Sequence, residues 1–78
     1  MKYVGIDIGK KKCQTCIMDE DGTILDEFVF SNDSDGISLL LSRLDCGCRV
    51  VMESTGNYWV RIYNAIEQND IEAKLANP

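Results

Sequence analysis

The stretch "KYVGIDIGKKKCQTCIM", residues 2–18, sets the direction of the first two strands. Its first seven residues alternate between apolar side chains and Tyr, Gly and Asp, which is the two-residue period of a strand. A second apolar run, residues 13–18, follows a polar link of Gly and three Lys. Only antiparallel neighbours can be joined by so short a link, so the stretch predicts an antiparallel pair.

The rest of the chain extends this pair into a mixed sheet. An Asp-Gly turn at residues 21–22 returns the chain into a third strand. The later apolar patterns predict a helix capped within residues 31–34 and continuing to Leu44, a strand over 48–52, a helix carrying Trp59, Ile62, Tyr63 and Ile66, and a strand over 71–75. The order is therefore βββαβαβ. Right-handed crossovers place the fourth strand parallel to the first and beside it, giving an α/β fold with a five-stranded sheet of order 3-2-1-4-5.

Size and charge limit the classes of protein to consider. A chain of 78 residues is one small domain at most, and its 45% hydrophobic content is that of a folded protein. The net charge of −5 argues against binding nucleic acid by charge alone. The sequence has neither an apolar run of membrane-spanning length nor a secretory signal, so we expect a cytoplasmic protein without a membrane partner.

Four cysteines raise the alternative of a zinc site. Cys13 and Cys16 have the usual spacing, but Cys46 and Cys48 are separated by one residue only. In the predicted sheet, Cys13 and Cys46 fall at opposite ends. We therefore expect reduced thiols and no zinc.

Two carboxylates are the candidate catalytic residues. Asp7 lies near the end of the first strand, and Glu53 ends the fourth. Neighbouring strands are about 4.8 Å apart, so both side chains are expected at one edge of the sheet. A carboxylate within an apolar central strand is costly unless it is paired or metal-bound. Carboxylate oxygens are ligands that Mg²⁺ and Mn²⁺ prefer, and we predict that both residues bind metal. Ser54 and Thr55 are predicted to start the next helix.

This pattern resembles a known nuclease core. The order βββαβαβ with an acidic residue in the first strand is similar to the RNase H-like, or RuvC-like, core. "YVGIDIGKKK", "VVMESTGNYW" and the terminal "LANP" resemble the start of the DEDD transposases of the insertion-sequence 110 family, and "ESTGNY" is the most specific part. In that family four acidic residues form the metal site, and the first two correspond to Asp7 and Glu53.

The resemblance implies a function for a longer protein. Residues 1–78 would be the N-terminal part of a RuvC-like catalytic domain, with the other two acidic residues beyond Pro78. The intact protein would carry out metal-dependent phosphoryl transfer on DNA during transposition of an insertion sequence. The resemblance further implies a C-terminal domain with a serine nucleophile and, in some members, a guide RNA. Residues 1–78 alone are expected to be inactive.

Residues beside the two carboxylates are candidates for nucleic-acid contact. They are Lys10, Lys11, Lys12, Asn57 and Tyr58. Tyr58 could stack on a base, whereas Trp59 heads the apolar stripe of its helix and is expected in the core. The alternative for the lysines is a solvated hairpin tip.

The first hairpin allows an alternative function. The first hairpin also resembles that of sugar kinases and actin-like ATPases, in which an Asp-x-Gly turn binds phosphate. Those turns usually continue with small hydroxyl residues, whereas here three lysines follow Gly9, which favours the transposase. A non-catalytic interaction module is a third alternative. Two helices shield only part of five strands, so we expect a homo-oligomer formed through a bare sheet face or an edge strand.

Overall fold

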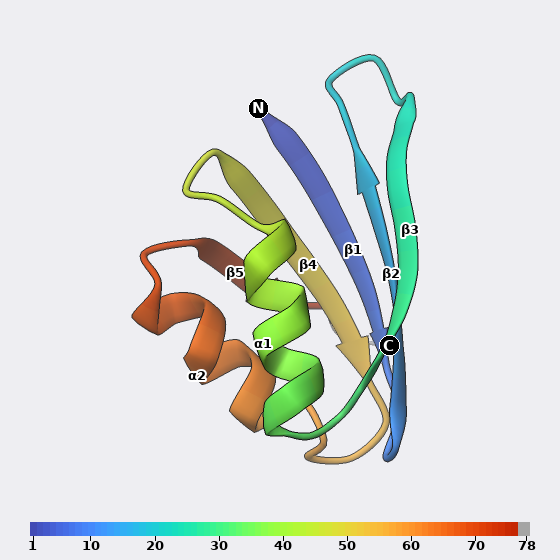
Figure 1. The fold of residues 1–78 in the computed structure, drawn as a ribbon, viewed down its shortest axis with the longest axis vertical. Coiled ribbons are helices and arrows are strands. Elements are labelled where there is room, and N and C mark those ends of the chain that lie inside the picture. The colour runs from blue at the N-terminus through green and yellow to red at the C-terminus, as the bar shows by residue number, and fades with distance from the viewer. Residues whose placement is uncertain (77–78) are drawn as a thin grey trace.

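A computed structural model describes residues 1–76 of the chain as a single sheet with two helices packed on it (Figure 1). The elements in chain order are β1 (Lys2–Ile8), β2 (Lys12–Met18), β3 (Ile24–Ser31), α1 (Ser34–Arg43), β4 (Cys48–Ser54), α2 (Val60–Gln68) and β5 (Glu72–Leu75). The last two residues of the "LANP" motif lie outside the described residues.

The sheet has the predicted order, β3-β2-β1-β4-β5. β2 runs antiparallel to both β1 and β3, whereas β1, β4 and β5 are mutually parallel. The α/β fold class and the mixed five-stranded sheet are thus confirmed. The bounds of β1 are as predicted, and those of the other strands differ by one or two residues. β4 continues through Glu53 to Ser54 because both residues remain paired with β1.

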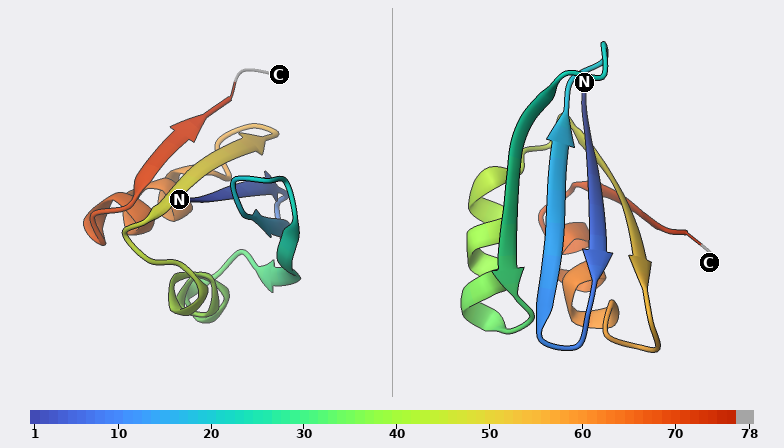
Figure 2. Two further views of the ribbon diagram at one scale, coloured as in Figure 1. Left: turned by 90° about the horizontal axis from the view of Figure 1, so that it is seen from above. Right: turned by 90° about the vertical axis from the view of Figure 1, so that its right-hand side faces the viewer.

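Both helices pack on the same face of the sheet (Figure 2). The alternate residues of β1 and β4 that are buried with the inward residues of α1 and α2 are Val4, Ile6, Ile8, Cys48, Val50 and Met52. The most deeply buried large side chains include Phe30, Ile8, Leu40, Met52, Ile62 and Ile66. Trp59 is partly buried against this core, as predicted.

The start of α1 is fixed by its N-cap residue, Asp33, and by Gly36 in its first turn. The Asp33 carboxylate accepts a hydrogen bond from the Gly36 backbone N–H at 2.8 Å, which caps the helix. At Gly36 the helix passes so close to β3 that an added Cβ would collide with the backbone carbonyl oxygen of Ser31. A side chain at Gly36 would therefore push α1 off the sheet.

The start of α2 differs from the prediction. Ser54 and Thr55 do not start the helix, because Ser54 remains in β4 as the register partner of Ile8. A turn region with a positive φ of 63° at Gly56 follows, and α2 begins only at Val60. Its N-cap residue, Trp59, makes no side-chain cap hydrogen bond. The five intervening residues, 55–59, form a loop beyond the end of β4.

The opposite face of the sheet is covered by no helix of residues 1–76 (Figure 2). We call it the open face. Several large apolar side chains on it are about half exposed: Tyr3 at 42%, Leu25 at 51%, Val29 at 52% and Val51 at 48%. The predicted bare face is therefore present in the described part of the chain.

Candidate functional site

Asp7 and Glu53 are direct register partners on the parallel strands β1 and β4. Both side chains are exposed, whereas the preceding residues, Ile6 and Met52, are buried against the helices. The two carboxylates therefore project from the open face at the same level of adjacent strands, which lie about 4.8 Å apart. The predicted pairing on one face is confirmed.

The carboxylates border a shallow hollow of about 360 Å³ on the open face, here called the carboxylate hollow. Gly5 lies in its floor, between its register partners Cys16 of β2 and Val51 of β4. A Cβ built on Gly5 would have no heavy atom within 4 Å, so the missing side chain leaves open space beside Asp7. Gln14, the partner of Asp7 on β2, adds an amide to the border.

Neither carboxylate has a cationic partner within residues 1–76. The ion pairs of this part of the chain use Glu20, Asp45, Asp26 and Glu72 instead. Two negative charges at directly opposite positions of neighbouring strands repel each other and destabilise the sheet. A bound cation would remove this repulsion, and the oxygen donors of Asp7 and Glu53 have the chemistry that Mg²⁺ and Mn²⁺ prefer.

One premise of the sequence prediction is wrong. Asp7 is not buried among apolar side chains, because its side of the central strand faces solvent in residues 1–76. The cost of burying a carboxylate therefore gives no support for metal binding here. Among the same residues no group of three His, Cys, Asp or Glu side chains could hold a metal ion, so the pair supplies only part of a coordination shell.

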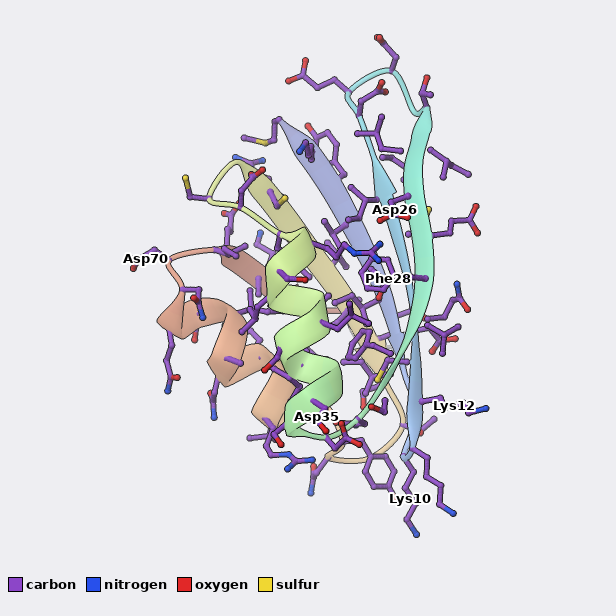
Figure 3. All side chains as sticks on the ribbon, viewed as in Figure 1. Lys10, Lys12, Asp26, Phe28, Asp35 and Asp70 are labelled. Atoms are coloured by element: carbon purple, nitrogen blue, oxygen red, sulfur yellow. The ribbon has the colours of Figure 1, made fainter. Side chains whose placement is uncertain are left out.

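Lys10 and Lys12 of the first hairpin border different hollows. Lys12 belongs to β2 and borders a second part of the open face together with Asp7 and Gln14. Lys10 instead borders a separate hollow with Asn57 and Tyr58. Figure 3 shows Lys10 and Lys12 extending into solvent at the end of the sheet where β1 finishes. Lys11 uses its backbone carbonyl to accept a hydrogen bond from the Asn32 N–H at 2.9 Å.

Asn32 and Arg61 are polar residues of this region that the sequence analysis did not assign to a site. The Asn32 side-chain amide donates to the backbone carbonyls of Gly9 at 3.0 Å and Tyr58 at 3.1 Å. Arg61 Nη2 donates to the Asn32 carbonyl at 3.0 Å. The only sequence signal was the position of Asn32 beside the α1 cap, which suggested a capping role. Its long-range bonds depend on the tertiary fold.

The cysteine pairs lie far apart along the sheet, as predicted. Cys13 is the register partner of Ile8 at the end of β1, whereas Cys48 is the partner of Lys2 at its start. Burial raises the pKa of the Cys13 thiol, and the negative charge of Asp7 adds to the increase. Burial likewise raises the pKa of the Cys48 thiol. All four cysteines are free.

The comparisons with known proteins identify the family. A mixed sheet of this order with an acidic residue on its central strand is consistent with an RNase H-like core. The sequence matches the family model of the insertion-sequence 110 DEDD transposases, described as a transposase, over residues 4–78. The chain therefore belongs to this family. None of the curated proteins is similar enough in sequence to count as a match.

Two solved structures are similar to the chain, and the first of them bears on the fold alone. A ROK family protein from Streptococcus pneumoniae TIGR4, in complex with sucrose, has a TM-score of 0.62 and 22% identity, over 99% of this chain and 34% of that one. A Ppx/GppA phosphatase from Aquifex aeolicus has a TM-score of 0.48 and 16% identity, over 100% of this chain and 36% of that one. The chain thus spans about a third of the length of these structures.

The helices of residues 1–76 are α1 and α2. Neither has the length and the apolar character that crossing a bilayer requires.

Proposed function

We propose that this chain is the part of a transposase catalytic domain that supplies two carboxylates, Asp7 and Glu53, to a Mg²⁺ or Mn²⁺ site. The observation that carries the proposal is their direct pairing on one face of adjacent parallel strands. Membership of the DEDD transposase family supports the assignment, because acidic residues give that family its name.

The chemistry proposed is phosphoryl transfer on DNA during transposition of an insertion sequence. A divalent cation at this position would stabilise negative charge on the reacting phosphodiester. Asp7 and Glu53 would hold it from one side, and the space above Gly5 leaves room for further ligands. Two carboxylates fill only part of the coordination shell, so the intact enzyme needs acidic residues in addition to this pair.

The partners follow from the same assignment. DNA is the proposed substrate, and a guide RNA is the additional partner that the family resemblance implies. The net charge of −5 is compatible with DNA binding if the contact is local, and Lys10 and Lys12, which extend into solvent at the end of the sheet, are the residues proposed for it. We also propose a cytoplasmic location.

The test uses a transposase that contains this chain, assayed for cleavage or joining of DNA with Mg²⁺ and with Mn²⁺. Asp7→Asn and Glu53→Gln each remove one anionic ligand and keep the side-chain size. We expect each to lower the rate by at least about a hundredfold, the scale of loss typical of removing charge stabilisation from a transition state.

A matched control distinguishes this effect from a general loss of negative charge. Glu27→Gln removes an exposed carboxylate from β3, in a position that does not border the carboxylate hollow. It should retain activity within about threefold of the parent protein, a change of less than 1 kcal/mol in the barrier. Equal activity of all three variants would exclude the proposed role of Asp7 and Glu53.

A further inference from the structure

A second hollow lies at the end of the sheet where β1 finishes, on the side of the α2 N-terminus. Its volume is about 180 Å³, and we call it the basic hollow. It is lined by Lys10, Asn32, Asn57, Tyr58, Val60 and Arg61. No carboxylate is among these lining residues, although acidic residues outnumber basic ones in the chain by 13 to 8.

Asn32 joins the three segments that form the basic hollow. Its backbone N–H and side-chain amide donate to carbonyls of the β1–β2 hairpin, at Lys11 and Gly9. The same amide donates to Tyr58 in the loop between β4 and α2. The hairpin that carries Lys10 is thereby held against the loop that carries Asn57 and Tyr58.

A hydrogen bond to Asn32 also holds Arg61 at the basic hollow. Its Nη2 donates to the Asn32 backbone carbonyl, which fixes the direction of the guanidinium. This bond uses one N–H of the five that a guanidinium carries. Asp33 is an acidic group close enough to interact electrostatically with Arg61, but its carboxylate already accepts hydrogen bonds from Gly36 and Ser31.

The basic hollow lies at the end of the two strands that carry the carboxylates. Lys10 follows Asp7 by three residues, and Asn57 follows Glu53 by four, across the same end of β1 and β4. Arg and Lys together are suited to a phosphate, because the planar guanidinium can donate two parallel bonds and the ammonium adds a second positive charge.

We propose that the basic hollow binds one phosphate of a DNA strand through Lys10 and Arg61, at the end of the sheet where the strands that carry Asp7 and Glu53 finish. Asn32 is the positioning residue, because it holds both sides of the hollow together. This proposal rests on the proposed function for the identity of the strand. It adds a backbone contact that fixes where the strand lies relative to the carboxylates.

The experiment measures binding of a single-stranded DNA oligonucleotide to the full chain in EDTA, as a function of salt. Lys10→Gln/Arg61→Gln removes both positive charges from the hollow. Lys2→Gln/Arg49→Gln is the matched control, because it also removes one Lys charge and one Arg charge. These two residues lie at the start of β1 and β4, where both side chains form exposed ion pairs. Circular dichroism checks that both variants are folded.

We expect the hollow variant to bind DNA at least about fivefold more weakly than the control, with a salt slope smaller by about 0.7, the value for one phosphate of a single strand. Amide chemical shifts of parent protein on DNA addition should change at residues 9–11, 32 and 57–61. Equal affinities and slopes for the two variants would overturn the proposal, as would binding that appears only with RNA of the same sequence.

The DNA affinities measured in this experiment do not depend on the metal site, because EDTA removes divalent cations. Asp7→Asn should preserve the difference between the two double variants. Failure of the basic hollow appears as loss of that difference, whereas failure of the proposed function appears as Mn²⁺ binding that does not depend on Asp7 or Glu53.

Discussion

Asp7 of β1 and Glu53 of β4 stand side by side on the open face of the sheet, paired in register across parallel strands. The connection from β3 through α1 brings them together from positions 46 residues apart (53 minus 7). Any change that slips β4 against β1 by one residue would turn one of the two carboxylates toward the helices. The metal site proposed here therefore depends directly on strand register.

The first prediction concerns activity of residues 1–78 alone. They should show little or no Mg²⁺-dependent DNA cleavage, because two carboxylates do not fix a cation well enough to orient both the attacking and the leaving oxygen. A gel assay with a labelled oligonucleotide measures this. Cleavage that is above background and is lost in Asp7→Asn would show that the pair is sufficient.

The second prediction concerns Thr15, which is fully buried with no hydrogen-bond partner for its hydroxyl oxygen within residues 1–76. Thr15→Val removes the unpaired hydroxyl and should raise the free energy of unfolding by roughly 1 kcal/mol. Thr15→Ser, the control, loses a buried methyl group and should lower it by roughly 1 kcal/mol. Urea unfolding measures both, and a destabilised Val variant would indicate a bonded hydroxyl.

The third prediction concerns acid stability and Asp33. The Gly36 N–H and then the Ser31 hydroxyl hold the pKa of the Asp33 carboxyl below its ordinary value of 3.8, and the positive charge of Arg61 adds to this. A lowered folded-state pKa gives stability that is complete above the unfolded-state pKa and is lost as the pH falls through the folded-state pKa.

Asp33→Asn keeps an oxygen that can cap α1 but does not titrate. The stability advantage of the parent protein over this variant should therefore be constant above about pH 5 and decrease below the ordinary Asp pKa of 3.8. Thermal unfolding between pH 2 and 6 measures it. Parallel stability curves for the two proteins across that range would show that the carboxylate does not stabilise the fold.

The fourth prediction concerns self-association of the chain. Val29 is 52% exposed on β3, an edge strand, and belongs to the apolar surface of the open face. We propose that two copies associate through this face or edge, so the mean mass should increase with concentration. Val29→Lys should weaken association about tenfold, because burying a Val contributes roughly 1.5 to 3 kcal/mol. Light scattering that finds a monomer at every concentration would contradict this.

Much of this fold follows from short-range pattern. The two-residue alternation of residues 2–8 and the short links on either side of β2 determine the antiparallel strands, and the crossovers determine the parallel ones. The pairing of Asp7 with Glu53 could be predicted for the same reason. It needs only strand order and the position of each carboxylate along its strand.

The loop after β4 could not be predicted in this way. Ser54 and Thr55 have the side chains of N-cap residues, but pairing with β1 continues to Ser54 and the turn at Gly56 delays α2 to Val60. The role of Asn32 was likewise outside local pattern, because its partners Gly9 and Tyr58 are 23 and 26 residues away in sequence. Tertiary contacts, rather than local propensity, decide both features.

The most direct test of the account is Mn²⁺ binding to the chain, followed by the loss of the free Mn²⁺ signal in electron paramagnetic resonance. Parent protein and the Glu27→Gln control should bind with the same affinity. Asp7→Asn and Glu53→Gln should each bind at least about tenfold more weakly, a loss of about 1.4 kcal/mol. If both variants bind Mn²⁺ as tightly as the parent protein, Asp7 and Glu53 do not form the metal site.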